Sequence, residues 1–242
     1  MTHSMKKENH PVGQKELIKV VFAAILAALA LIVGYVEIVW PLAPWLKLDF
    51  SEVVVLISFI LLGFRHTVGV IVVRSVIRWL VTTNSTNTPF PFFGETIAIV
   101  ASISLVVIYL LVSKILKVDN KPKSKETERV KSPYHLAKNG PVKVIAKEIG
   151  LIVIVTILMA LFMVVFNFLV VTPSFLSAGE HPFFLSFLRA GGNPRMGGGN
   201  IVSYAIAITT FYAPFNLLKF ASCLIIFTMM KKPILSTIDL RS

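Results

Sequence analysis

The sequence predicts an all-α membrane protein, a six-transmembrane-helix bundle with both chain termini in the cytoplasm. The 242 residues are 55% hydrophobic and 15% charged, and the mean hydropathy is +0.79, which is too apolar for an ordinary soluble domain. Long apolar stretches alternate with polar segments, and the basic residues gather in segments that would share one side of the bilayer. One compact membrane domain fits this length.

The net charge of +12 follows membrane topology rather than forming a nucleic-acid-binding surface, so we expect no nucleic-acid partner. The single cysteine, Cys223, lies in an apolar stretch and is expected to be a small packing residue. The chain is polar up to about Lys19, which differs from a cleavable signal peptide.

The spans follow from the thickness of a bilayer core, about 30 Å, which requires about 20 helical residues. The second predicted span is short, and about 15 residues reach only about 22 Å. Its outer end should therefore stop below the interface and leave Asp49 and Glu52 in a recess open to the outside. The six predicted spans cover residues 18–40, 50–64, 67–83, 92–116, 148–172 and 202–230.

The predicted domain organisation is a cytoplasmic N-terminal tail (1–15), a six-helix transmembrane domain (16–232) and a cytoplasmic C-terminal tail (233–242). Residues 117–147 are rich in Lys, Ser and Glu, as expected of a basic cytoplasmic loop. The extracellular connection 173–201 contains two glycine clusters, which permit unusual backbone angles. This connection is either a lid or a featureless linker.

Charged and amide side chains recur in the outer halves of several spans. Each intramembrane charge costs about 2.5–3.5 kcal/mol, so these side chains should pair or face an interior cavity. Arg74 and Arg78 share one helical face because they are four residues apart, and Ser75 flanks that face. Lys219 follows Asn216 by three residues. The other members of this polar set are Glu37, Glu95 and Asn167.

Each of these residues also has a purely structural interpretation. Glu37 and Glu52 near helix ends could meet water, and Arg78 could extend to the outer interface. Arg74 and Lys219 could form structural ion pairs, while Asn167 could join two helices. Pro214 removes a backbone donor just before Asn216 and frees the carbonyl of Thr210, which membrane helices tolerate beside a cavity or another partner.

Aromatic and small residues mark two further surfaces. Trp45 belongs to an aromatic group near the outer boundary, where such residues form an interfacial belt or stack on a flat ring.

The first span contains small residues at four-residue spacing, which let another helix approach closely in lipid. Packing within the same bundle is the alternative. These small residues are Ala23, Ala27, Ala24 and Ala28.

Together these features resemble the substrate-binding S component of energy-coupling factor (ECF) vitamin transporters, and most closely the riboflavin-specific branch. The likeness covers roughly residues 16–232. The sequence elements that carry it are Leu46-Lys47-Leu48-Asp49-Phe50-Ser51-Glu52, Leu62-Gly63, Arg74-Ser75, Gly94-Glu95, Phe166-Asn167-Phe168 with Pro173, and Pro214-Phe215-Asn216-Leu217-Leu218-Lys219.

The resemblance implies a six-helix bundle in the bacterial plasma membrane with an outward vitamin pocket. It implies riboflavin as the transported substrate and no cofactor. The partners implied are a transmembrane coupling subunit, which the alanine face of the first helix would contact, and two ATP-binding-cassette ATPases. The residues expected to bind substrate are Asn216, Lys219, Asn167, Glu95, Arg74, Ser75, Arg78, Asp49, Phe50 and Trp45.

Departures from the riboflavin branch leave the substrate open. Ser75 stands where that branch commonly has Asn, and Arg78 adds a charge. A neutral flavin hardly requires two arginines, whereas an anionic vitamin would be attracted by them. An S component for another vitamin, such as an anionic one, is therefore the alternative.

Two other classes of function are weaker. An intramembrane enzyme is not expected, because the five histidines lie mostly near termini or loops and no H-E-x-x-H motif or serine elbow is present. A stand-alone secondary transporter usually shows internal duplication, and no convincing repeat relates residues 16–116 to 148–230. The chain lacks the G-x-x-x-x-G-K-[ST] nucleotide-binding loop, so an ATP-driven transporter would need another chain for ATP hydrolysis.

Overall fold

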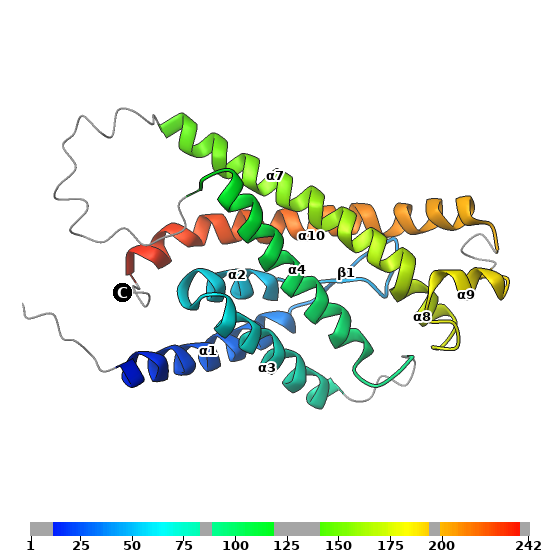
Figure 1. Ribbon diagram of the computed structural model, residues 1–242, viewed down its shortest axis with the longest axis horizontal. Coiled ribbons are helices and arrows are strands. Elements are labelled where there is room, and N and C mark those ends of the chain that lie inside the picture. Colours follow the sequence, from blue (N-terminus) through cyan, green and yellow to red (C-terminus); the bar gives the residue numbers. More distant parts are fainter. Residues whose placement is uncertain (1–11, 83–88, 119–140, 194–198, 238–242) are drawn as a thin grey trace, which may run out of the picture.

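The computed structural model describes residues 12–82, 89–118, 141–193 and 199–237. These residues form helices and one short hairpin, with the start of α1 and the end of α10 at one end of the molecule and α8 and α9 at the other (Figure 1). In chain order the elements are α1 (Val12–Gly34), β1 (Ile38–Val39), β2 (Lys47–Leu48), α2 (Ser51–Leu62), α3 (Phe64–Thr82), α4 (Phe93–Ile115), α7 (Pro141–Phe166), η1 (Asn167–Val171), α8 (Thr172–Leu176), α9 (Phe184–Arg189) and α10 (Ile201–Thr237).

The short helix α2 forms the centre of the bundle. All 12 of its residues are buried, and it packs against α1, α3, α4 and α10. A helix that is apolar on every side can be stable when other helices surround it. Gly63 ends α2 at φ 86°, a left-handed angle that favours glycine, and its N–H donates to the Phe59 carbonyl oxygen at 3.1 Å. This turn lets α3 begin at once.

Among the described residues, four helices are long and apolar enough to cross a bilayer; they lie within α1, α4, the α7–α8 segment and α10. Their outer surfaces are apolar, as at Ile32, Leu161 and Ile206, which are 66%, 58% and 62% exposed. Helix α2 is too short by this measure and α3 contains three arginines. The fold is mostly helical as predicted, and the count of six spans stays a prediction.

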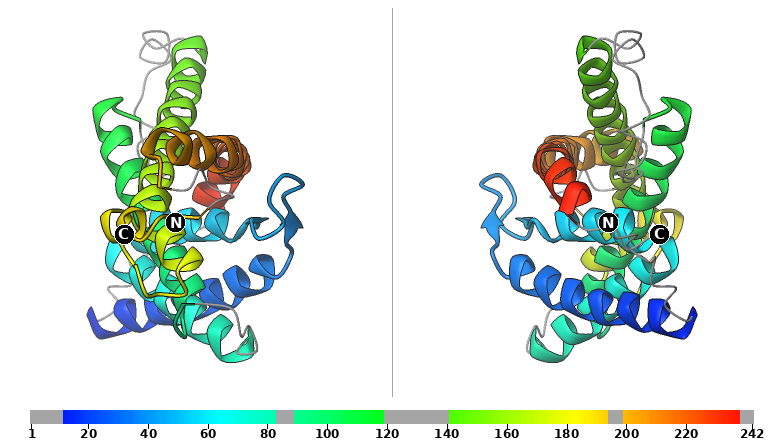
Figure 2. Two further views of the ribbon diagram at one scale, coloured as in Figure 1. Left: turned by 90° about the vertical axis from the view of Figure 1, so that its right-hand side faces the viewer. Right: turned by 90° about the vertical axis from the view of Figure 1, so that its left-hand side faces the viewer.

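The first predicted span, about 18–40, ends too late, and its helix begins earlier than the span. Helix α1 begins at Val12 and ends at Gly34, so part of the predicted tail 1–15 is helical. Beyond Gly34, β1 pairs antiparallel with β2, and two residues that pair in a ladder cannot also continue a helix. Figure 2 shows this hairpin standing out at one side of the helices.

The start of α7 and the end of α10 also differ from the predicted boundaries. Helix α7 begins at Pro141, inside the predicted loop 117–147, because proline is well suited to the first turn of a helix; residues 119–140 of that loop lie outside the described residues. Helix α10 continues through Pro214 and Pro233 to Thr237, so part of the predicted tail 233–242 is also helical. Residues 1–11 and 238–242 lie outside the described residues.

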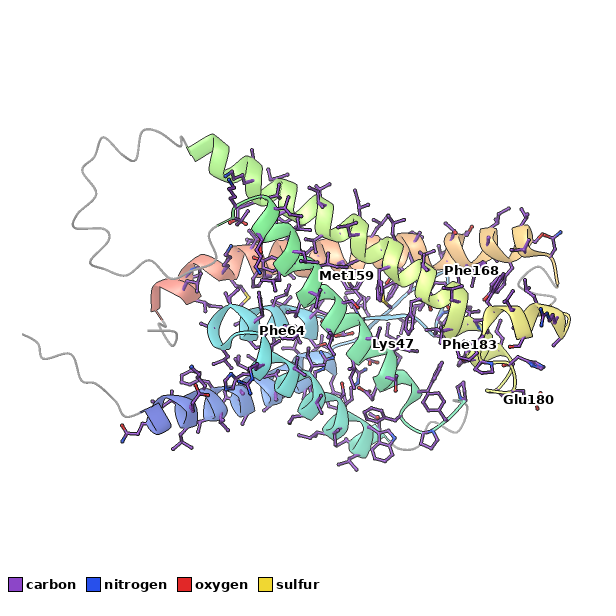
Figure 3. The ribbon with its side chains drawn as sticks, in the orientation of Figure 1. Lys47, Phe64, Met159, Phe168, Glu180 and Phe183 are labelled. Carbon is purple, nitrogen blue, oxygen red and sulfur yellow. The ribbon has the colours of Figure 1, made fainter. Side chains whose placement is uncertain are left out.

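The predicted connection 173–201 is not a featureless linker in its described part. Most of α8 and all of α9 lie within it, and Phe187 of α9 packs in a second small core with Tyr204, Ile208 and Tyr212 of α10. Phe168 of η1 and Phe183 lie at this end of the molecule, away from the start of α1 and the end of α10 (Figure 3). Gly197 and Gly198 lie outside the described residues, and the lid stays a prediction.

The small residues of α1 face two directions. Ala27 is 2% exposed and belongs to the main core, whereas Ala24 and Ala28 are exposed and Ala23 is half-buried. The close packing of α1 against α2 and α3 therefore depends on a small side chain at Ala27. The main core also buries Cys223, as predicted.

Replacing Ala27 with leucine should destabilise the chain by about 1–3 kcal/mol, because a larger side chain overfills a packed interior. Thermal unfolding of the purified protein in detergent measures the effect. Ala28→Leu is the matched control, since its side chain points away from the core and should leave the midpoint nearly unchanged. Equal midpoints for the two variants would contradict this packing.

Candidate functional site

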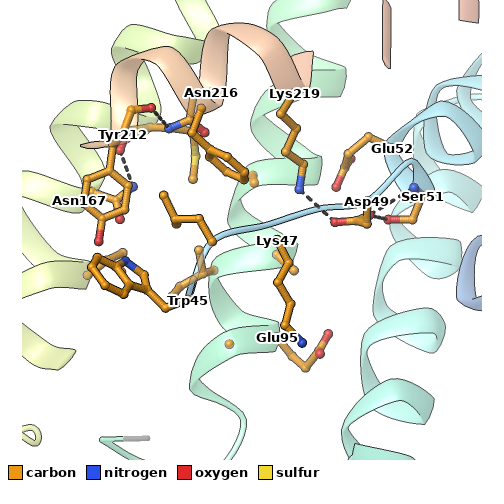
Figure 4. Close-up of a pocket in the computed structure, with 18 of the residues that line it drawn as sticks. Trp45, Lys47, Asp49, Ser51, Glu52, Glu95, Asn167, Tyr212, Asn216 and Lys219 are labelled. Atoms are coloured by element: carbon orange, nitrogen blue, oxygen red, sulfur yellow. Dashed lines mark hydrogen bonds and ion pairs between the residues drawn. The ribbon is translucent and has the colours of Figure 1, made fainter. Parts of the chain in front are cut away.

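The described residues line a partly open cavity of about 350 Å³, within the roughly 300–1,000 Å³ typical of small-molecule pockets. It lies between the hairpin, α2, α3, α4, the α7–η1–α8 segment and α10 (Figure 4). Of the residues expected to bind substrate, the structure brings eight together at this cavity: Trp45, Asp49, Arg74, Arg78, Glu95, Asn167, Asn216 and Lys219.

An ion pair joins α10 to the segment before α2. Lys219 Nζ donates to Asp49 Oδ2 at 2.9 Å, while Asp49 Oδ1 accepts from the Ser51 backbone N–H at 3.1 Å and from the Ser51 hydroxyl. Asp49 is 8% exposed. A carboxylate that bonds the start of the next helix is held in one orientation, so the position of Lys219 is coupled to the start of α2 (Figure 4).

A second polar group lies deeper, around Arg74 of α3. Its Nη1 donates to Ser51 Oγ at 3.0 Å and its Nη2 donates to Ser102 Oγ of α4 at 3.0 Å. The Ser102 hydroxyl donates to Glu52 Oε1 at 2.7 Å, and Arg74 Nη1 lies 3.7 Å from the same oxygen. Arg74 and Glu52 are each 2% exposed. Arg74 therefore binds three helices together from inside the bundle.

A third group lies around Arg78, one helical turn further along α3. Its Nη2 contacts Glu37 Oε1 at 2.6 Å and its Nε lies 3.5 Å from Glu95 Oε1 of α4. Lys47 Nζ of β2 lies 2.5 Å from the other oxygen of Glu37. Glu37 thus ties the hairpin to α3. Arg78 is only 21% exposed and does not extend freely to the interface.

The charges that line the cavity cancel. Its described lining contains four cations and four carboxylates, and every cation has a carboxylate within 4.0 Å. The cations are Lys47, Arg74, Arg78 and Lys219, and the carboxylates are Glu37, Asp49, Glu52 and Glu95. The two arginines therefore do not create a surplus of positive charge.

Two amides line the end of the cavity away from the Asp49–Lys219 pair (Figure 4). Asn167 Nδ2 donates to the Met163 carbonyl at 2.7 Å, and Asn216 Nδ2 donates to the Tyr212 carbonyl at 2.8 Å. Because only Nδ2 can donate, each Oδ1 is left as an acceptor, and neither accepts a hydrogen bond from the described residues. Asn167 begins the π-helix η1, a local widening that often occurs at functional sites.

Aromatic side chains connect the hairpin to α10 and cover this amide end. Trp45 lies against Phe211 with ring centroids 6.1 Å apart, and Trp40 meets Phe215 edge to face at 5.9 Å. Tyr212 and Phe215 line the cavity. Sequence reasoning missed both, although their spacing from Asn216 and Lys219 places all four near one face of α10.

Two residues expected in the site are placed elsewhere. Phe50 packs against the main core, just before α2, and Ser75 is fully buried; neither lines the cavity. Ser75 lies next to Arg74 in a helix, so the two side chains diverge by about 100°, which follows from 3.6 residues per turn. A role for either residue in binding stays a prediction.

The arrangement is suited to holding a molecule. It offers acceptors, paired ions and aromatic surfaces around a partly open cavity. Buried polar atoms without a hydrogen-bond partner in the described residues include Glu52 Oε2, Glu95 Oε2 and Arg74 Nε, and such atoms usually find a partner in water or a ligand. Among the described residues, no group of three or more His, Cys, Asp or Glu side chains could hold a metal ion.

Arg74→Met should lower the free energy of unfolding by about 3–5 kcal/mol, because it leaves the Glu52 carboxylate buried without a counter-charge. Thermal unfolding in detergent measures this loss. Adding Glu52→Gln to Arg74→Met should restore much of the stability by removing the uncompensated charge. If Arg74→Met were as stable as the unaltered protein, the buried network would not hold the helices together.

Comparisons with known proteins point to one family. The family model described as "ECF transporter, substrate-specific component" matches residues 18–230. A solved structure described as "Structure and mechanism of the S component of a bacterial ECF transporter" is similar with a TM-score of 0.54 and 16% sequence identity, over 90% of this chain and 95% of that chain. No curated protein gives a significant match to the sequence.

The structural likeness shows a shared fold, and the family model spans most of the chain. Members of this family are substrate-binding subunits and not enzymes, as expected here, and they associate with the membrane and ATPase subunits of a transporter. This chain belongs to the family of substrate-specific (S) components of ECF transporters.

Proposed function

We propose that this S component binds riboflavin, or a closely related uncharged ring vitamin, for uptake across the bacterial plasma membrane. The observation that carries the proposal is the cavity that joins a charge-balanced end to an amide and aromatic end. Tyr212, Phe215 and Trp45 would cover a flat ring. The Asn167 and Asn216 carbonyl oxygens would accept hydrogen bonds from ring N–H groups or hydroxyls.

The charge balance favours an uncharged vitamin over the anionic alternative. Each lining cation is already paired with a carboxylate, and an anion entering the cavity would meet as many negative as positive groups. A hydroxyl can donate to a carboxylate and accept from an ammonium or guanidinium group. Paired ions of this kind suit a hydroxylated side chain such as that of riboflavin.

The proposed topology is six spans with both termini in the cytoplasm. The start of α1 and the end of α10 lie at the same end of the molecule (Figure 1), as an even number of crossings requires. Lys and Arg are concentrated in the predicted tails and in 117–147, which favours the cytoplasm for that end. Helices α2 and α3 would then be the other two spans, with α2 at the centre of the bundle and the buried Arg74 of α3 facing inward, away from lipid.

Riboflavin binding tests the proposal directly. The purified protein should quench flavin fluorescence in a saturable manner, with one vitamin bound per chain. A panel of other vitamins, including anionic ones, tests the selectivity. If riboflavin does not bind and an anionic vitamin does, the flavin proposal is wrong.

Lys219→Ala should weaken riboflavin binding by about 10- to 100-fold, which corresponds to the loss of a hydrogen bond to a charged group. Fluorescence titration measures the dissociation constant. Leu217→Ala, an exposed position on the same helix, is the control and should bind normally. An unchanged affinity for Lys219→Ala would remove this residue from the site.

Ala24→Leu or Ala28→Leu should prevent assembly with the coupling subunit and the two ATPases while leaving riboflavin binding intact. Both side chains are exposed on α1, where a small-residue surface admits a partner helix. Ala27 is buried and cannot serve such a contact directly. Co-purification of the subunits and vitamin uptake by cells measure the effect, and lost binding with normal assembly would contradict it.

A further inference from the structure

Among the described residues that line the cavity, Arg78 is the one cation that forms ion pairs with two carboxylates. Glu37, between α1 and β1, contacts Nη2, and Glu95 of α4 faces Nε. The three side chains are 21%, 19% and 12% exposed, and all three line the cavity. They are therefore less buried than the Arg74 group and within reach of a bound molecule.

An arginine beside a pocket is well suited to a phosphate or carboxylate, because its planar fork can donate two parallel hydrogen bonds. Here the Nε and Nη2 edge of the fork already faces two carboxylates. Glu37 takes Nη2 of Arg78 and also the Lys47 ammonium at 2.5 Å, so one carboxylate engages both cations of this part of the lining. An incoming anion would have to displace Glu37 while lying beside Glu95.

We infer that Glu37 and Glu95 are specificity-determining residues that exclude anionic ligands by occupying Arg78 and Lys47. The inference rests on the proposed function only for the identity of the transported ligand. Its physical basis is general. Carboxylates close to an incoming anion repel it, and a cation that is already paired with a carboxylate attracts that anion only weakly.

The consequence concerns phosphate esters of the vitamin. A phosphorylated ligand brings about two negative charges near neutral pH, and the part of the lining that the structure describes is neutral and holds no surplus cation to receive them. The site therefore takes the unphosphorylated molecule, and an ester outside the cell would need hydrolysis by a phosphatase before uptake.

Removing the carboxylates should convert this part of the lining into an anion site. In Glu37→Gln/Glu95→Gln, Arg78 and Lys47 lose their counter-charges while the side chains keep nearly the same size. Inorganic phosphate should then stabilise the purified protein against heat, in comparison with chloride at equal ionic strength. The unaltered protein should show no such effect. Glu37→Gln alone removes one of the two carboxylates and should show an intermediate effect.

Two controls separate the specific effect from a change in net charge. Glu180→Gln removes one carboxylate from an exposed position at the far end of the molecule (Figure 3) and should not create a response to phosphate. Adding Arg78→Gln to the double variant should abolish the response. Absence of stabilisation in the folded double variant, or its persistence without Arg78, would overturn the inference.

A second measurement links the inference to transport. The ratio of the affinities for riboflavin and riboflavin 5′-phosphate should shift toward the ester by about tenfold or more in the double variant, as expected for a close charge contact in a partly desolvated site. If the unaltered protein binds neither flavin but the phosphate response appears as expected, the proposed substrate is wrong and the role of the carboxylates stands. If riboflavin binds and the ratio does not change, the role of the carboxylates fails and the substrate stands.

Discussion

Charge compensation inside an apolar bundle is the constraint on which the rest of this structure depends. Arg74 and Lys219 lie on helices whose other surfaces are apolar, and an unpaired charge there would cost several kcal/mol. Each is paired with a carboxylate from the start of α2 or the segment before it. The pairing therefore fixes α3 and α10 relative to α2, and it also shapes the cavity between them.

This arrangement explains why the polar residues serve both stability and recognition. Ser51 accepts from Arg74 and donates to Asp49, so the deep network and the Asp49–Lys219 pair are continuous. A ligand that contacts Lys219 would meet a side chain whose position is already set. Preorganisation of this kind reduces the entropy lost on binding, and it is consistent with a subunit whose task is to capture a small molecule.

The hairpin contributes in a different way. Its aromatic residues contact α10 through Phe211 and Phe215, and Lys47 contacts Glu37, which in turn meets Arg78 of α3. The hairpin thus adds side-chain contacts to α10 on one side of the cavity and to α3 on the other. Its strands have two residues each, so the position of the hairpin depends on these side-chain contacts rather than on an extended sheet.

The sequence by itself determined the class of fold, the family and most of the polar lining, because apolar periodicity, charges within apolar stretches and short motifs are local signals. Tertiary structure alone decided the rest. Helix α1 gives way to a hairpin because β1 pairs with β2, and the four alanines divide between the core and the surface according to how α1 rotates against α2 and α3. The neutral charge of the described cavity lining also depends on pairs of residues that are far apart in the chain, such as Asp49 and Lys219. The packing of the helices brings such residues together, and no single stretch of sequence specifies that packing.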